Sequence, residues 1–76
     1  MTLANMQRGQ RYFIHQINCE DQALVSKILA LGMIPGETIE LLHHAPLGDP
    51  MQIKAGATYI SIRKKDGCFV EVEPLQ

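Results

Sequence analysis

The chain of 76 residues has few aromatic side chains and almost no net charge. It contains no tryptophan, two tyrosines and two phenylalanines, so it offers no row of rings on which the bases of a single strand stack. Its formal net charge is −1, whereas a nucleic-acid-binding protein typically carries a clustered positive excess. Both absences argue against a nucleic acid as the partner.

The sequence also lacks the apolar segments that export or membrane insertion requires. No run approaches the roughly 20 apolar residues of a membrane-spanning helix. The opening stretch MTLANMQRGQ has no signal-peptide apolar region, so we expect a cytoplasmic protein. The two cysteines, Cys19 and Cys68, have no CxxC spacing and are expected to be reduced, small hydrophobic residues rather than a disulfide.

The length of the chain predicts a single small domain, residues 1–76. A domain of this size buries only about 60% of the surface of its unfolded chain, so one small core is the limit. Hydrophobic residues make up 46% of the chain, which is enough for a folded core and too much for a disordered segment.

The first regular element is expected to be an irregular strand. Its apolar positions are Tyr12, Ile14 and Ile17, an offset of two followed by an offset of three. Such a change of step predicts a strand with a bulge.

The next stretch, NCEDQALVSKILALG, changes to a helical period. Its apolar residues lie on one wide helical face: Leu24, Val25, Ile28, Leu29 and Leu31. Asn18 is a candidate for the helix cap, and Glu20 and Asp21 in the first turn suit the positive end of the helix dipole.

The end of this helix is marked by a glycine and a proline. Gly32 supplies the left-handed residue that stops a helix, and Met33 then packs back on Ile28, as in a Schellman motif. Pro35 and Gly36 follow as the central residues of an expected type II turn.

Beyond this turn the pattern alternates with a period of two. The apolar pairs are Ile39 with Leu41, Met51 with Ile53, Ile60 with Ile62, and Val70 with Val72. Four or five short strands, one short helix and tight turns predict a mainly β protein, a small antiparallel barrel. The polar segment Arg63–Gly67 is expected to form a helical or tight turn between the last two strands.

Two adjacent histidines, His43 and His44, look like a metal pair. Neighbouring side chains of a strand point to opposite faces, so they do not share one ion easily. We expect a half-buried His43 and a solvated His44, and no metal site, since no HxxxH, HxH or ExxH spacing occurs. The alternative is a site that joins His44 to a distant ligand from the set His15, Cys19 and Glu20.

No catalytic group is evident, so we expect a protein that is not an enzyme. Cys19 precedes a helix, where a thiolate is stabilised, but no base is placed to activate it. Ser26 and Ser61 lack a GxSxG context. The glycines occur singly, which excludes a phosphate-binding loop, and no cofactor is expected.

The one basic run, Arg63–Lys65, is interpreted as a solvated turn. The acidic residues expected to balance it are Asp66, Glu71 and Glu73. The alternative is a barrel that binds RNA through this run. Phe69 is either an exposed anchor or a cover for one end of the barrel.

The segment LALGMIPGETIELLHHAPLGDPMQIK resembles the signature of the FeoA family, ferrous iron transport protein A. The resemblance is carried by Leu31, Gly32, Met33, Pro35 and Gly36, by Ala45–Pro50, and further on by ISIRKKDG and VEVEP. It implies an SH3-like barrel with a helical insertion after the first strand. It also implies a cytoplasmic accessory protein of bacterial ferrous iron uptake that acts with a membrane permease carrying a GTP-binding domain. It brings no metal-ligand motif.

The function expected from these observations is docking. The contact is predicted on the APLGDP loop, together with one aromatic residue: Pro46, Leu47, Gly48, Asp49, Pro50 and Phe69. The protein would be peripheral to the membrane through its partner only, and weak self-association is left open. In one alternative the loop is only a turn and Leu47 folds inward. In another the protein is a ferrous-iron-binding chaperone or sensor related to the SH3-like domain of iron-dependent metalloregulators.

Overall fold

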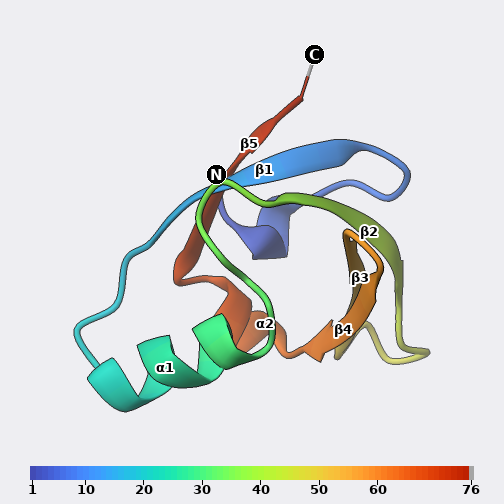
Figure 1. Cartoon of the computed structure of the whole chain (residues 1–76). Helices are drawn as coiled ribbons and strands as arrows, with labels where there is room; N and C mark the ends of the chain where they lie inside the picture. Colours follow the sequence, from blue (N-terminus) through green and yellow to red (C-terminus); the bar gives the residue numbers. More distant parts are fainter. Residues whose placement is uncertain (76) are drawn as a thin grey trace.

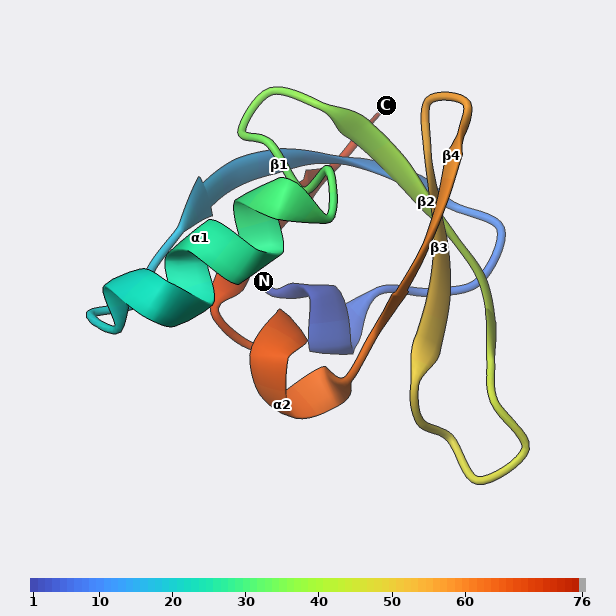
Figure 2. The same cartoon turned by 60° about the horizontal axis from the view of Figure 1, so that its bottom comes forward.

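The computed structural model describes residues 1–75, which form a five-stranded antiparallel sheet and three short helical segments (Figure 1). The elements are η1 (Leu3–Asn5), β1 (Arg11–Ile17), α1 (Gln22–Ala30), β2 (Thr38–His44), β3 (Met51–Ala55), β4 (Thr58–Ile62), α2 (Lys64–Gly67) and β5 (Val70–Pro74). The strand order is β4-β3-β2-β1-β5. The sheet curves around η1 and α2 (Figure 2), and the prediction of a mainly β protein with a helix after the first strand is confirmed.

The alternating apolar residues face the inside of the curved sheet, as the period of two predicts. All eight are at most 3% exposed: Ile39, Leu41, Met51, Ile53, Ile60, Ile62, Val70 and Val72. Tyr12 and Ile14 of β1 join the same core. Because successive strand residues point to opposite faces, this pattern fixes which face of each strand is buried.

The predicted irregularity of the first strand is confirmed. β1 pairs with β5, and the pairing shifts register between Ile14 and Gln16. Such a shift leaves one residue of the bulged strand without a direct partner and bends the strand.

The start of α1 differs from the prediction. Asp21, not Asn18, is the cap, because its carboxylate accepts hydrogen bonds from the backbone N–H groups of Ala23 at 3.0 Å and Leu24 at 3.3 Å. The Asn18 side chain instead donates to Glu71 at 3.0 Å. The tertiary partner on β5 therefore decides the role of Asn18, and the helix begins three residues later than a cap at Asn18 implies.

The buried face of α1 is narrower than predicted. Ile28 is fully buried, while Leu24, Val25 and Leu31 are half-buried and Leu29 is 39% exposed. The helix lies along the rim of the curved sheet rather than over a flat face (Figure 1), so only one stripe of its side chains reaches the core.

The end of α1 is the predicted Schellman motif. The N–H of Met33 donates to the carbonyl of Ile28 at 3.3 Å, and the N–H of Gly32 donates to Leu29 at 3.0 Å. Gly32 has φ +104° and Met33 is fully buried. The following turn also matches, because Gly36 has φ +92° and the N–H of Glu37 donates to Ile34 at 3.0 Å.

Replacing Gly32 with valine is expected to lower the free energy of unfolding by more than about 1 kcal/mol, because a β-branched residue is strained at positive φ. A Cβ there would also lie 3.4 Å from Cδ1 of Ile60. Chemical denaturation measures the change, and Gly32→Asn is the comparison variant, expected to lose less stability than Gly32→Val because asparagine is not β-branched and enters positive φ more readily. Equal midpoints for the valine variant and the unmodified chain would contradict the assigned helix end.

The packing of η1 on α2 was not predicted. Leu3 of η1 is fully buried, and it lies against Gly67 of α2. A Cβ built on Gly67 would be 3.1 Å from Cβ of Leu3 and 3.0 Å from Cε of Met51. The short helix therefore approaches the core closely at a residue that has no side chain.

Candidate docking surface

The loop between β2 and β3 presents an apolar tip to solvent. The N–H of Gly48 donates to the carbonyl of Ala45 at 2.7 Å, which closes a turn with Pro46 and Leu47 as its central residues. Proline at the second position and glycine at the fourth are typical of a type I turn. The Leu47 side chain is 96% exposed, so the alternative that Leu47 folds inward is wrong.

The loop is held in one shape by hydrogen bonds across its base. The N–H of Ala45 donates to the carbonyl of Pro50 at 3.0 Å. The ring Nδ1 of His44 lies 3.2 Å from the carbonyl oxygen of Gly48, and Gly48 has φ +87°. These contacts order the loop before any partner is bound.

Asp49 ties the same loop to α2. Its Oδ1 accepts a hydrogen bond from the backbone N–H of Lys64 at 2.9 Å, and its Oδ2 lies 3.9 Å from Nη1 of Arg63. The first of these contacts satisfies one of the free N–H groups at the start of the short helix. Asp49 therefore has a structural role, in addition to its predicted place on a contact surface.

The structure separates Phe69 from this loop. Phe69 is half-buried, its carbonyl accepts from the N–H of Asn18 at 2.7 Å, and it precedes β5 at the far end of the strand order from β3. Figures 1 and 2 both show the start of β5 and the β2–β3 loop on opposite sides of the molecule. The predicted surface is thus two separate features, and partner contact at either one stays a prediction.

The two histidines lie at the end of β2 and are both exposed. The prediction that His43 is half-buried is wrong, because β2 and β3 shift register between Leu41 and His43. Leu42 is the extra residue of this bulge and has no partner on β3. His43 therefore points away from the face that holds Leu41. The solvated position predicted for His44 is confirmed.

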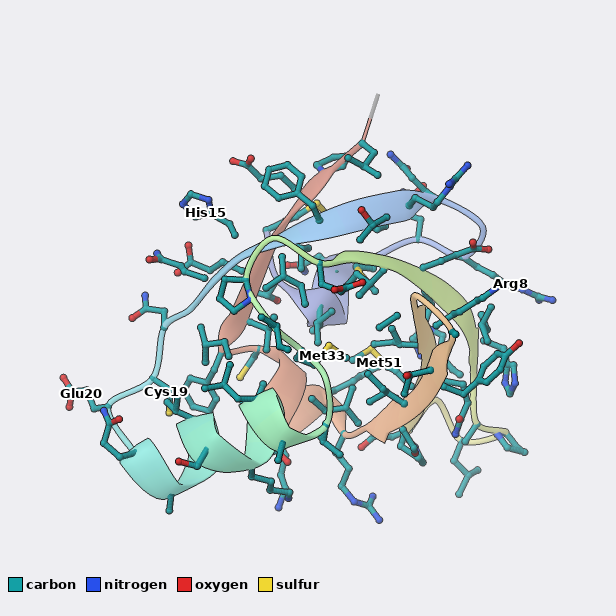
Figure 3. All side chains as sticks on the ribbon, in the orientation of Figure 1. Arg8, His15, Cys19, Glu20, Met33 and Met51 are labelled. Atoms are coloured by element: carbon teal, nitrogen blue, oxygen red, sulfur yellow. The ribbon has the colours of Figure 1, made fainter. Side chains whose placement is uncertain are left out.

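The distant metal ligands considered for His44 are not gathered around it. Figure 3 shows His15 pointing outward above the end of β1, apart from Cys19 and Glu20, whereas Met33 and Met51 point into the interior. In Figures 1 and 2, residues 15–20 lie across the molecule from the end of β2. Within residues 1–75, no group of three His, Cys, Asp or Glu side chains is arranged to hold a metal ion.

Both cysteines are free thiols. Cys19 is half-buried, and its Sγ lies 3.8 Å from the carbonyl oxygen of Asp21. Cys68 is exposed, with Sγ 3.0 Å from the carbonyl of Lys65, so the expectation of a packed hydrophobic residue fails for it. The side chain forms its contact at the surface because α2 ends there.

The acidic neighbours of the basic run differ from the prediction. Asp66 does lie near a cation, but this is Lys27 of α1, at 3.5 Å. Glu71 faces β1 instead, where it accepts from Gln16 Nε2 at 3.2 Å and from Asn18 Nδ2 at 3.0 Å.

The hydrogen bond from Gln16, which has the larger effect, and the one from Asn18 both lower the pKa of Glu71, because they stabilise its ionised carboxylate. Since the folded pKa is below the unfolded one, the resulting stability is present at neutral pH. It is lost as the pH falls through the folded pKa.

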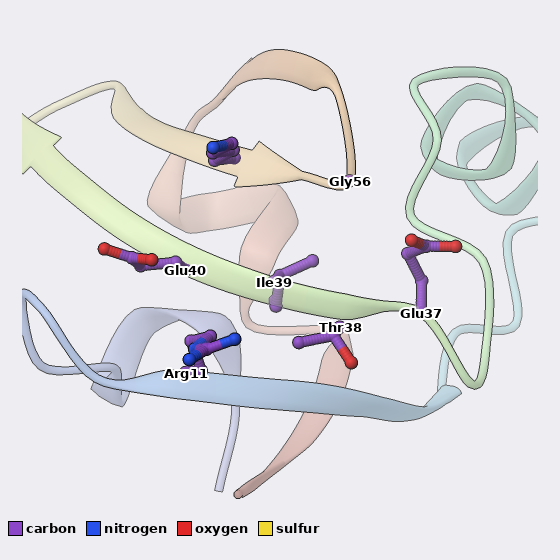
Figure 4. A pocket seen from close by; sticks show the side chains of 7 residues that line it. Arg11, Glu37, Thr38, Ile39, Glu40 and Gly56 are labelled. Carbon is purple, nitrogen blue, oxygen red and sulfur yellow. The ribbon is translucent and has the colours of Figure 1, made fainter.

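The outer face of the sheet carries a shallow hollow of about 230 Å³ (Figure 4). Opposite charges alternate across it, since Arg11 pairs with Glu40 in the β1–β2 register and Glu40 pairs with Lys54 in the β2–β3 register. Glu37, Thr38, Ile39 and Gly56 complete the lining. The alternating signs leave no net field to attract a charged ligand.

The FeoA domain family matches residues 1–74 of the sequence. The chain belongs to the FeoA family. The resemblance seen in the APLGDP and LGMIPG motifs is thereby confirmed, and it extends over nearly all of the described residues.

Two relatives show what this chain is similar to. The iron(II) transport protein A of Clostridium thermocellum has a solution structure with a TM-score of 0.90 and 35% identity, covering 99% of this chain and 46% of that one. A fusion of Fe(2+) transport protein A with the Fe(2+) transporter FeoB, from Porphyromonas gingivalis, is 31% identical over 74 residues, or 96% of this chain and 8% of the fusion. This chain therefore spans less than half the length of either relative.

A third likeness supports the fold alone. The crystal structure of FeoA from Stenotrophomonas maltophilia, described as an SH3 domain protein, superposes with a TM-score of 0.82 at 21% identity, covering 96% of this chain and 89% of that one. The FeoA chain described here has the SH3-like fold that was predicted. Among residues 1–75, no helix combines the length and apolar character needed to cross a bilayer.

Proposed function

We propose that residues 1–76 form a single FeoA domain that docks on a membrane ferrous iron permease with a GTP-binding domain. It supports the assembly or the activity of that permease and has no chemistry of its own. It works on the cytoplasmic side and is peripheral to the membrane through its partner only, without a nucleic-acid ligand.

The observation that carries this proposal is the Porphyromonas gingivalis relative, in which a segment similar to this chain is joined to the FeoB transporter. Linking two modules turns their encounter into an intramolecular event at high effective concentration. A fused arrangement is productive when the two parts work together, so the separate chain is proposed to associate with the same kind of transporter.

The β2–β3 loop is the proposed contact. Its hydrogen-bonded base reduces the conformational entropy that binding would otherwise remove. The exposed Leu47 side chain offers apolar area that a partner pocket would take out of water.

A pull-down tests this proposal. The purified cytoplasmic GTP-binding domain of the permease from the same organism is passed over the immobilised chain without nucleotide, with GDP, and with a non-hydrolysable GTP analogue. We expect retention in at least one nucleotide state and release by an excess of the free chain. If the domain is retained no better by the immobilised chain than by a blank resin in all three nucleotide states, direct docking on this domain is contradicted.

The alternative of a ferrous-iron chaperone or sensor is tested in parallel by anaerobic calorimetry. Adjacent strand histidines and the absence of a ligand cluster within residues 1–75 predict no stoichiometric site. A site of low micromolar affinity that is lost on His44→Ala would favour the iron-binding function over docking.

A further inference from the structure

A cleft of about 300 Å³ lies where α1, β4 and α2 meet. Its apolar lining is formed by the half-buried Leu31 and Pro50, together with Ile62, which is only 3% exposed. Three cationic side chains also line it, namely Lys27 from α1, Arg63 just after β4, and Lys65 from α2. Ser61 and one carboxylate, Asp66, complete the lining. The sequence separates these residues by up to 38 positions, and only the fold brings them together.

The cleft concentrates positive charge in a chain that is acidic overall. Four of the seven Lys and Arg residues lie at this corner, namely Lys27 and Arg63–Lys65. Of the eight acidic residues, only Asp49 and Asp66 contact them. The corner therefore carries a net charge of about +2 and the rest of the chain about −3, a separation that orients an approaching acidic partner.

The cations of the cleft remain available to a ligand. The Lys27 and Arg63 side chains are 64% and 62% exposed, and their carboxylate partners lie at 3.5 Å and 3.9 Å. Exposed ion pairs at such distances hold their members weakly. Lys65 forms no ion pair with any residue in the described part of the chain.

We propose that this cleft binds an acidic peptide segment of a protein partner. Its carboxylates face Lys27, Arg63 and Lys65, and one apolar side chain packs on Leu31 and Pro50, the half-buried apolar residues of the lining. A free anion would leave that apolar lining in water, so the lining favours a peptide. A nucleic acid would need stacking rings, which the lining lacks.

The inference stands on the cleft alone and goes beyond the docking proposed for the Leu47 tip. The two features are neighbours, because Pro50 ends the β2–β3 loop and also lines the cleft. A partner that covers both would be held at two points, one apolar and one electrostatic, but neither contact requires the other.

The test uses a blocked pentapeptide of four glutamates around a central leucine, titrated into the isotope-labelled chain and followed by two-dimensional NMR. We expect the largest amide shifts at residues 27–31 and 61–67, and at Met51, which follows Pro50 and supplies the nearest backbone N–H because proline has none. Raising the salt from about 0.01 M to about 1 M shortens the Debye length from about 30 Å to about 3 Å and should abolish the shifts.

Charge reversal provides the matched control. The double variant Lys27→Glu with Lys65→Glu is expected to weaken binding at least 10-fold. The double variant Arg8→Glu with Lys54→Glu makes the same change of net charge at exposed sites outside the cleft, and is expected to weaken it less than 3-fold. Melting curves of both variants verify that they are folded.

Three results would overturn the inference. The first is a set of shifts scattered over the surface, and the second is equal weakening by the two double variants. The third is displacement of the peptide by equimolar inorganic phosphate, combined with no loss of affinity when serine replaces the central leucine, which would make the cleft a simple anion site. Each result leaves the pull-down with the permease domain unaffected.

Discussion

Replacing Leu47 with aspartate is expected to abolish ferrous iron uptake while leaving the protein folded. The side chain is 96% exposed, and substitutions at such positions usually change stability by no more than about 0.5 kcal/mol. Removing a central apolar anchor from an interface costs about 2 kcal/mol or more, roughly a 30-fold loss of affinity. A charge placed in the same apolar contact would cost at least as much.

The measurement is uptake in cells that lack their own copy and are complemented with the variant, alongside a melting curve of the purified protein. Tyr59→Asp is the matched control, because Tyr59 is also apolar and 68% exposed but lies on β4. We expect normal uptake with the control. Normal uptake with a folded Leu47→Asp protein would exclude the loop as the main contact.

Replacing Gly67 with valine is expected to lower the free energy of unfolding by about 1–3 kcal/mol, the usual cost of overpacking a core. The first added carbon would already be 3.1 Å from Cβ of Leu3, which lies close to the backbone and cannot swing away. The two further methyl groups of valine would extend into the same contact between α2 and η1. Urea denaturation measures the change.

The control is Lys65→Val, which places valine at an exposed position of the same short helix. Its effect is expected to stay within about 0.5 kcal/mol. The double variant of Gly67→Val with Leu3→Ala should lose less than the sum of the two single losses, because the smaller side chain relieves part of the clash. Strict additivity would show that α2 is not crowded against η1.

Much of the fold follows from local pattern. The period of two assigned the buried face of four strands, and the Gly32–Met33 pair assigned the end of α1 correctly. The start of α1 was missed because Asn18 and Asp21 are both good caps, and the choice between them depends on Glu71, which lies 53 residues further on. The capping propensities of the residues near the helix start carry no information about that distant partner.

The candidate site was predicted in part. The APLGDP motif marked the loop, and the structure confirmed the exposed tip at Leu47. The sequence did not place Phe69 relative to this loop, because adjacency to Val70 says nothing about which side of the barrel β5 occupies, and partner contact at Phe69 stays a prediction. The sequence showed the basic run Arg63–Lys65 but not the cleft, since Lys27 and Leu31 lie more than 30 positions earlier in the chain and only the fold brings them to this run.

The sequence by itself determined the local geometry of this protein: the alternating strands, the positive-φ glycines that end the helix and set the turns, and membership of the FeoA family. These depend on residues a few positions apart, where sterics and hydrogen bonding act directly. Only the tertiary structure decided the cap at Asp21, the bulge that turns His43 outward, the close contact of Gly67 with Leu3, and the gathering of four cations at one corner. Each of these depends on how the sheet curves and closes, because burial and charge act between residues that the chain places far apart.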